Sequence, residues 1–185
     1  LTPEIEARVL DEIIRPTLAE MAARGTPYQG VLYAGLMIRD GRARLVEYNV
    51  RFGDPECQVL MLRLGAQALD AMLACARGEL AGARLNWAED HAMTVVMAAR
   101  GYPGPYAKGE EIGGLREASE DPHLQIFHAG TKADGDRILS NGGRVLNATA
   151  RGATLAEARA HAYAALKHID WPGGFYRSDI GWRAL

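Results

Sequence analysis

Apolar residues recur at helical spacing in the first part of the chain. Between residues 3 and 24 they stand three or four positions apart, which is the period of an amphipathic helix. Thr2 followed by Pro3 is a typical start, with a capping side chain and a proline in the first turn. Pro16 lies inside the pattern, so we expect the helix to be kinked or divided there and to end at Arg24-Gly25.

The next segment predicts a β-hairpin followed by a helix. Residues 30–38 are apolar almost throughout, as in a strand buried on both faces. Asp40-Gly41 is a typical hairpin turn, and residues 44–50 form the return strand. A single helix is then predicted from Asp54 to Gly78, and Asp54 before Pro55 is an N-cap signal.

The pattern changes near residues 85–90, where short strands and glycine turns begin. Strands are predicted at residues 91–99, 124–130, 137–139 and 144–150. Gly142-Gly143-Arg144 indicates a hairpin turn with a solvated arginine between the last two strands, and a phosphate contact by Arg144 is the alternative. Thr154 to Glu157 is a capping box that opens a helix reaching Ile169. We therefore expect an α+β chain in two parts, residues 1–87 and 88–185.

Composition narrows the function classes. The chain has 185 residues and a formal net charge of −2, without the basic patch that nucleic-acid binding requires. We see no run as long as a membrane span and no leader before the first helix. Cys57 and Cys75 fall in one predicted helix about 27 Å apart, so a disulfide between them is not expected and a reduced, cytoplasmic protein fits best. The first residue is Leu, which is compatible with a fragment or a processed product.

The run from Glu47 to Glu56 carries most of the chemical information. On an extended strand Glu47, Asn49 and Arg51 would line the same face. Oxygen ligands from Glu and Asn suit a hard cation such as Mg²⁺, and an arginine beside them suits a phosphate or carboxylate. The solvated face of a strand shows the same alternation, so spacing alone leaves both interpretations open.

Further motifs reveal a resemblance that covers nearly the whole chain. They are Tyr28–Met37, Asn49–Glu56, Gly101-Tyr102-Pro103, Phe127–Thr131, Gly142–Leu146 and Phe175–Gly181. In this order the chain resembles the carboxyl-terminal portion of the phosphoribosylamine–glycine ligases, or glycinamide ribonucleotide synthetases, of the ATP-grasp superfamily. The resemblance implies the second half of an ATP-grasp core, an antiparallel sheet with helices, followed by a small α+β carboxyl-terminal domain.

The resemblance also implies a reaction and a set of site residues. ATP would phosphorylate glycine to glycyl phosphate, and the amine of 5-phosphoribosylamine would displace phosphate to give glycinamide ribonucleotide. Glu47 and Asn49 would ligate Mg²⁺ or Mn²⁺ at the nucleotide, and Arg51 would bind the phosphoryl group and act in catalysis. A catalytic role is not expected for Cys57. Weaker candidates for substrate contact are Asp54, Glu56, His128 and Arg177, of which His128 is read first as a structural histidine.

Two departures from the family pattern limit this expectation. Residues 35–38 offer no second acidic ligand, which makes Glu47 the principal carboxylate. Neither G-x-x-x-x-G-K-[ST] nor G-x-G-x-x-G occurs, so the phosphate-binding lid has to come from the missing N-terminal portion of the same enzyme. We therefore expect the segment to be inactive alone. The alternatives are another ATP-grasp ligase or carboxylase, or a non-catalytic scaffold module.

Overall fold

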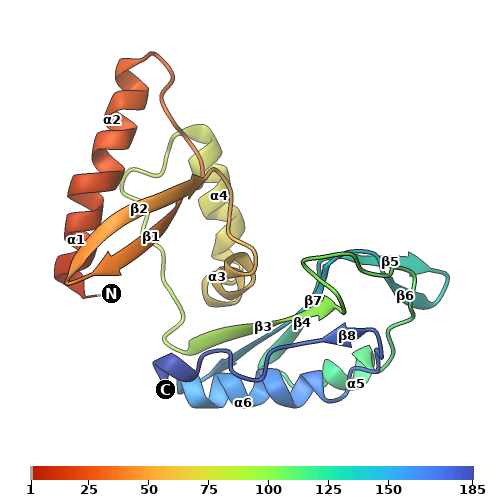
Figure 1. Cartoon of the computed structure of the whole chain (residues 1–185). Coiled ribbons are helices and arrows are strands. Elements are labelled where there is room, and N and C mark those ends of the chain that lie inside the picture. Colours follow the sequence, from red (N-terminus) through yellow and green to blue (C-terminus); the bar gives the residue numbers. More distant parts are fainter. Residues whose placement is uncertain (1) are drawn as a thin grey trace. The chain divides into compact units, whose positions relative to one another are not determined.

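The computed structural model describes residues 2–185, and these form two compact units (Figure 1). The first unit contains residues 2–53 and Gln67–Arg84, and the second contains Asp54–Ala66 and Leu85–Leu185. All strand pairs in both units are antiparallel, and helices accompany them, so the predicted α+β class is confirmed. The division of the sequence at residue 87 stays a prediction.

The first unit opens with a helix that is divided ahead of Pro16, as predicted. Helix α1 (Pro3–Val9) begins after Thr2, whose hydroxyl accepts a hydrogen bond from the Ile5 N–H at 3.4 Å. A π-helical turn (Leu10–Ile14) separates it from α2 (Arg15–Ala23). Proline lacks an N–H and its ring clashes with the carbonyl four residues earlier, and the wider turn accommodates both effects.

The predicted hairpin forms from strands β1 (Tyr33–Arg39) and β2 (Arg42–Asn49). Asp40 and Gly41 connect them with φ values of 51° and 68°, which is the backbone twist that a two-residue turn needs. The expectation of a strand buried on both faces was wrong. Within the described chain β1 pairs with β2 alone, and the side chain of Met37 is 62% exposed.

The single helix predicted from Asp54 to Gly78 is two helices. Helix α3 (Glu56–Leu64) ends at Gly65, whose φ is +58°, and α4 (Gln67–Arg77) follows. The two helices belong to different units, α3 to the second and α4 to the first. Cys57 and Cys75 are therefore on separate helices, and both are free thiols.

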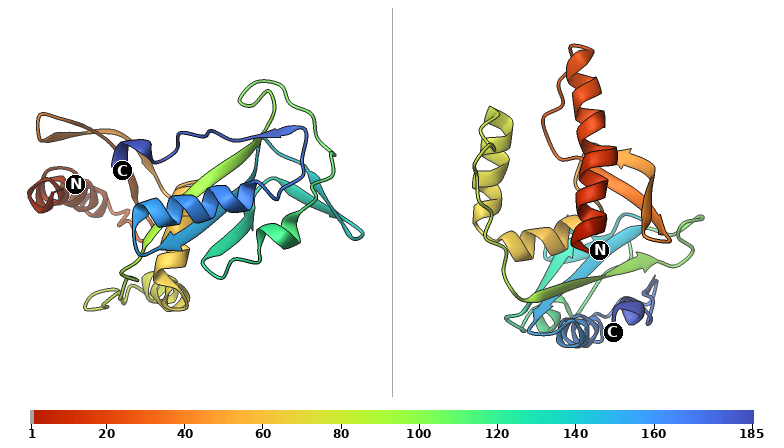
Figure 2. Two further views of the ribbon diagram at one scale, coloured as in Figure 1. Left: turned by 90° about the horizontal axis from the view of Figure 1, so that it is seen from below. Right: turned by 90° about the vertical axis from the view of Figure 1, so that its left-hand side faces the viewer.

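A four-stranded antiparallel sheet forms the centre of the second unit (Figure 1). Its order is β4 (Leu124–His128), β7 (Arg144–Gly152), β3 (His91–Ala99) and β8 (Gly174–Phe175). Helix α6 (Leu155–Leu166) packs along one face, as Figure 2 shows, and α3 contacts β3 and β7. Since successive strand residues face opposite sides, alternate residues of β3 and β7 turn toward α6 and form the buried core there.

The capping box predicted for α6 forms in a slightly shifted version. The Thr154 hydroxyl accepts a hydrogen bond from the Glu157 N–H at 3.2 Å. The Glu157 carboxylate accepts one from the N–H of Ala153, one residue earlier than in the usual box, at 2.9 Å. The start of the helix was therefore readable from sequence.

A small hairpin, β5 (Thr131–Asp134) with β6 (Arg137–Ser140), was not fully foreseen. Its two-residue turn lies at Gly135 and Asp136. The expected hairpin between residues 137–139 and 144–150 is also wrong, because β6 pairs with β5, whereas β7 pairs with β3 and β4. The short helices α5 (Leu115–Ala118) and Trp182–Ala184 complete the unit.

Candidate metal and phosphate site

Glu47 and Asn49 lie side by side near the end of β2 in the first unit. The Asn49 Nδ2 donates a hydrogen bond to Glu47 Oε1 at 3.1 Å. Gly35 stands opposite Glu47 on β1, and a Cβ there would lie 3.2 Å from the Glu47 Cγ. The glycine thus leaves room for the carboxylate, while the Asn49 carbonyl oxygen and the second Glu47 oxygen remain as ligands for a cation.

The donor set fits a hard divalent cation. A carboxylate and an amide oxygen are the ligands that Mg²⁺ and Mn²⁺ prefer, and such ions keep waters or phosphate oxygens in their other positions. Among residues 2–185, no group of three or more His, Cys, Asp or Glu side chains is placed to hold a metal. Glu47 and Asn49 therefore provide one edge of a site and not a complete cage.

The strand register adds positive charge to the same face of the hairpin. A register shift between Gly35 and Leu36 places an extra residue in β2, so that Arg44 stands opposite Met37 and Arg42 opposite Arg39. Directly paired residues share a face, which puts these arginines on the face of Glu47 and Asn49. Met37, the three arginines and Asp40 line a hollow of about 620 Å³. One face of the hairpin thus offers oxygen ligands for a cation and guanidinium groups for an anion.

Arg51 follows two residues after the end of β2 and is exposed. Its Nη1 donates a hydrogen bond to the carbonyl oxygen of the next residue, Phe52, at 2.8 Å. A guanidinium carries five N–H donors in a planar fork, and this local bond uses one of them. The remaining donors suit a phosphoryl or carboxylate group.

Asp54 and Glu56 belong to the second unit, and the expected helix-capping role of Asp54 was wrong. Helix α3 begins at Glu56, so the cap position falls on Pro55, and no side chain caps the helix. The Asp54–Pro55 peptide bond is cis. The Asp54 carboxylate instead forms an ion pair with Arg144, Oδ2 to Nη2 at 3.2 Å, and the Asp54 carbonyl accepts a bond from Arg144 Nη1 at 2.9 Å. Arg144 is therefore engaged by Asp54 and is not a freely solvated turn residue.

Cys57 lies in the first turn of α3 and is half-buried. Partial burial raises the pKa of the Cys57 thiol, and the negative charge of Asp54 raises it further. The thiol therefore stays protonated near neutral pH, and a protonated thiol is a poor nucleophile.

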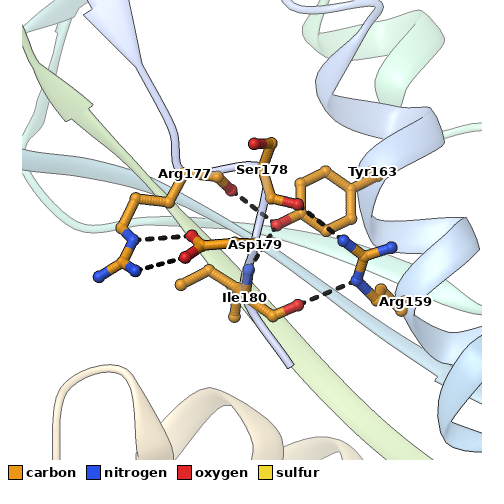
Figure 3. A network of polar contacts seen from close by, with 6 residues as sticks. All are labelled: Arg159, Tyr163, Arg177, Ser178, Asp179 and Ile180. Atoms are coloured by element: carbon orange, nitrogen blue, oxygen red, sulfur yellow. Dashed lines mark hydrogen bonds and ion pairs between the residues drawn. The ribbon is translucent and has the colours of Figure 1, made fainter. Parts of the chain in front are cut away.

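The two remaining candidates, His128 and Arg177, each bind a neighbouring side chain. His128 Nδ1 and the Thr131 hydroxyl are 3.0 Å apart at the turn between β4 and β5. Arg177 holds the Asp179 carboxylate through two bonds, Nε to Oδ1 at 2.8 Å and Nη2 to Oδ2 at 2.6 Å (Figure 3). The hydrogen bonds from Arg177 lower the pKa of the Asp179 carboxyl.

The segment that carries Arg177 is fastened to α6. Arg159 donates to the carbonyl oxygens of Ile180 at 2.9 Å and Ser178 at 2.7 Å, as Figure 3 shows. The Tyr163 hydroxyl donates to the Arg177 carbonyl at 2.6 Å and accepts from the Ile180 N–H at 3.1 Å. The backbone of this segment is thus held at four points by two side chains of one helix.

A hollow in the second unit brings Arg144 and Arg177 to one surface. Its volume is about 340 Å³, and its lining is mostly apolar and aromatic, with Pro55, Tyr102 and Tyr176 among its walls. His128 is not part of this lining. Sequence reasoning missed Arg144 as the partner of Asp54. The Gly101-Tyr102-Pro103 motif marked the region but not its contact.

The comparisons with known proteins match both parts of the chain. Residues 1–57 match the family model "Phosphoribosylglycinamide synthetase, ATP-grasp (A) domain", and residues 92–183 match the model of the C domain of the same enzyme. The chain belongs to the phosphoribosylglycinamide synthetase family. The Glu47–Asn49 pair lies within the part that matches the ATP-grasp domain, and Arg144 and Arg177 lie within the C domain.

Named relatives agree with this assignment. The chain is 54% identical to the phosphoribosylamine–glycine ligase of Mesorhizobium japonicum over 185 residues, which is all of this chain and 43% of the relative. It is 52% identical to the chloroplastic phosphoribosylamine–glycine ligase of Arabidopsis thaliana over 189 residues, or 36% of that protein. The chain thus spans less than half the length of these two relatives.

Solved structures show the same fold. The crystal structure of the phosphoribosylamine–glycine ligase from Thermotoga maritima matches 97% of this chain and 44% of its own, with a TM-score of 0.82 and 34% identity. An L-amino acid ligase from Bacillus licheniformis matches 96% of the chain with a TM-score of 0.60 and 17% identity, which shows a shared fold only. In residues 2–185, no single helix is long and apolar enough to cross a membrane, and α3 and α4 reach that length only as a broken pair.

Proposed function

We propose that the protein containing this chain joins glycine to 5-phosphoribosylamine at the expense of ATP, giving glycinamide ribonucleotide, ADP and phosphate. The names of the relatives and the order of the two domain matches support this reaction. The observation that carries the proposal is the contact between Glu47 and Asn49, at 3.1 Å, in the part that matches the ATP-grasp domain. Because the chain spans under half of these relatives, the activity belongs to the complete protein.

Each residue of the first unit has a chemical task in this proposal. Glu47 and Asn49 hold Mg²⁺ or Mn²⁺, which when bound neutralises charge on the nucleotide phosphates. Arg51 presents its free guanidinium donors to the transferred phosphoryl group and to the oxygens of the acyl phosphate. Two anions must approach each other in the first step, so both positive groups lower the barrier. Asn49 and Arg51 together form the nucleotide-binding edge.

The reaction proceeds in two steps. A glycine carboxylate oxygen forms a bond to the γ-phosphorus of ATP, and the bond to ADP breaks. The amine nitrogen of phosphoribosylamine then forms a bond to the carbonyl carbon, inorganic phosphate leaves, and the nitrogen loses one proton. The reaction belongs to purine biosynthesis, and we propose a cytoplasmic location for this protein.

The weaker substrate candidates remain part of the proposal. Asp54, Glu56, His128 and Arg177 are proposed to contact substrate. Arg177 has the strongest support among them, because it lines the 340 Å³ hollow together with Arg144. The support for Asp54 as a direct contact is smaller, since its carboxylate already binds Arg144.

The test measures phosphate release from ATP by the complete protein, with phosphoribosylamine generated in situ. Release that requires both glycine and phosphoribosylamine supports the ligase, whereas release that ignores glycine indicates another carboxylate substrate. Glu47→Gln keeps the size and hydrogen bonding of the side chain but removes its charge. We expect this variant to lose activity by about a hundredfold or more, a typical size for removing one charge-stabilising group. Turnover like that of the wild type at low Mg²⁺ would remove Glu47 from the metal site.

A further inference from the structure

Two glycine motifs that are separated by the β5–β6 hairpin meet at one point of the second unit. A Cβ on Gly130 would lie 2.7 Å from the Cα of Gly142, and a Cβ on Gly142 would lie 2.9 Å from the Cα of Gly130. The Asn141 N–H donates to the Gly130 carbonyl at 2.7 Å and closes the contact. The two backbones therefore approach so closely that glycine is needed on both sides.

A third motif packs against the next glycine. A Cβ on Gly143 would lie 2.3 Å from the ring of Tyr102, and the Gly143 carbonyl accepts a bond from the Ala99 N–H at 2.8 Å. We call Gly130, Gly142, Gly143 and Tyr102 the glycine junction. The junction fixes the chain on the N-terminal side of Arg144, at the first residue of β7.

Arg144 extends from this fixed point to Asp54. One of its nitrogens binds the Asp54 backbone carbonyl at 2.9 Å, and the other pairs with the Asp54 carboxylate at 3.2 Å. A fork that binds a main-chain and a side-chain oxygen of one residue restrains both the position of the backbone and the rotamer. The two side chains are 38% and 41% exposed, and such a pair contributes little to stability. Stability alone therefore does not account for the tight packing that places Arg144.

Asp54 is the third residue after Arg51, and only Phe52 and Gly53 separate them. The one hydrogen bond recorded for the Arg51 side chain within the described chain is to the adjacent Phe52 carbonyl. Because this bond is to the adjacent backbone, it moves with the backbone. The conformation of this short segment therefore determines the position of the Arg51 guanidinium.

We propose that Arg144 is a positioning residue for the ligase reaction, which acts through Asp54 on the Arg51–Pro55 segment. This inference rests on the proposed function and adds to it a residue of the C domain, Arg144. The glycine junction fixes the backbone position of Arg144. Arg144 in turn restrains Asp54, and Asp54 restrains the end of the run from Glu47 to Glu56, which begins with the metal ligands. The alternative role for Arg144, direct binding of the substrate phosphate, predicts a different kinetic result.

The test compares Arg144→Gln with Arg151→Gln in the complete enzyme. Arg151 is a matched control, because it also lies on β7 and pairs with an aspartate, Asp90, at 2.8 Å, with side chains 34% and 36% exposed. We expect Arg144→Gln to lower kcat about tenfold to a hundredfold, as a misplaced reacting group does, with the KM for phosphoribosylamine changed by less than about twofold. Arg151→Gln is expected to keep kcat within about twofold.

Two further measurements separate positioning from a general loss of structure. Asp54→Asn should lower kcat to a similar extent, and the double variant should lose no more than the worse single variant, because both changes break one connection. Amide hydrogen exchange at residues 51–56 should become faster in Arg144→Gln and stay unchanged in Arg151→Gln. Exchange across β3 and β7 should be equal in both, which shows that the unit remains folded.

Specific outcomes overturn the proposal. A rise in the KM for phosphoribosylamine at constant kcat would show that Arg144 binds substrate directly. Losses that multiply in the double variant would show that Arg144 and Asp54 act independently, and equal exchange at residues 51–56 would show that Arg144 does not hold this segment. If the wild-type enzyme shows no release dependent on glycine and phosphoribosylamine, the proposed function fails, while the exchange experiment still tests the contact.

Discussion

Replacing Asn147 by leucine is expected to stabilise the second unit, although it removes a polar side chain. Asn147 lies on β7 opposite Val96 of β3, on the face of the sheet turned away from α6. Its exposed fraction is 0%, and neither Oδ1 nor Nδ2 has a hydrogen-bond partner within the described residues. A buried polar group without a partner costs about 1–3 kcal/mol, so the native side chain is a local source of instability.

The size of the effect follows from two opposing contributions. Leucine has the same side-chain branching as asparagine but a larger volume, and overpacking a core costs about 1–3 kcal/mol. Removing the unpaired amide gains about 1–3 kcal/mol and burying an apolar side chain in its place gains about 1.5–3 kcal/mol, which leaves a net stabilisation of about 1 kcal/mol or more. Thr149→Val is the matched control, because Thr149 is also 0% exposed but its hydroxyl lies 2.8 Å from that of Thr94. Valine leaves the Thr94 hydroxyl unpaired and should cost about 1 kcal/mol.

Native-state hydrogen exchange in the complete protein measures both variants at the sheet itself. Opening free energies from the amides of β3 and β7 should rise in Asn147→Leu and fall in Thr149→Val, and a change of 1.4 kcal/mol corresponds to about tenfold in rate. Opposite signs at two positions on one face of one strand cannot come from a general effect of hydrophobicity. If Asn147→Leu speeds exchange as Thr149→Val does, a bound water or another partner satisfies the amide, and the reasoning is refuted.

Three further predictions concern the second unit. Partial burial raises the pKa of the Asp121 carboxyl, but hydrogen bonds from the His123 N–H and from His161 outweigh this effect and lower the pKa overall. The ionised Asp121 therefore stabilises the folded state above a pH of about 4, and this stabilisation is lost as the pH falls through the folded-state pKa. Asp121→Asn should therefore lose less stability than the wild type when urea unfolding is repeated from pH 6 down to pH 3. Gly114→Ala should lower the melting temperature more than Gly135→Ala. The two glycines have similar positive φ values, but a Cβ at Gly114 would lie 1.8 Å from a backbone oxygen, whereas a Cβ at Gly135 would have no neighbour within 4 Å. Equal losses would mean that backbone strain of about 1–2 kcal/mol accounts for both variants and that the close contact at Gly114 costs nothing. Leu146→Ala at a position with 0% exposure should cost about 2–5 kcal/mol in the same thermal assay, and a loss below about 1 kcal/mol would contradict the packing described for β7.

The elements that sequence predicted well have local causes. Thr2 and Thr154 each cap a helix through their own side chains, and Asp40-Gly41 forms its turn because both residues tolerate positive φ. The strand at residues 91–99 was bounded correctly, since turn residues flank an apolar run on both sides. In all these cases the determining interaction spans only a few positions, so the sequence pattern contains it.

The elements that were missed depend on distant parts of the chain. Apolar residues continue through Leu64-Gly65-Ala66, and periodicity alone carried the predicted helix across a point where the chain passes from one unit to the other. The β5–β6 hairpin had a readable signal in its two-residue turn, Gly135-Asp136, because glycine tolerates the positive φ that such a turn needs. The shared face of Glu47 and Arg44 depends on a register shift opposite Gly35, which no periodic pattern contains.

The candidate site shows the same division between local and distant causes. Glu47, Asn49 and Arg51 were chosen because their chemistry and spacing are visible in one short run, and Glu47 and Asn49 are in contact. Arg144 stands ninety positions from Asp54, beside two glycines that resemble an ordinary turn. In the structure those glycines instead permit close contact with Gly130 and Tyr102, and β7 pairs with β3 and β4 and not with the strand before it. A glycine pair next to an arginine therefore has two physical readings, flexibility or close packing, and only the partners of the glycines decide between them. Here the partners indicate close packing, which fixes the backbone from which Arg144 reaches Asp54.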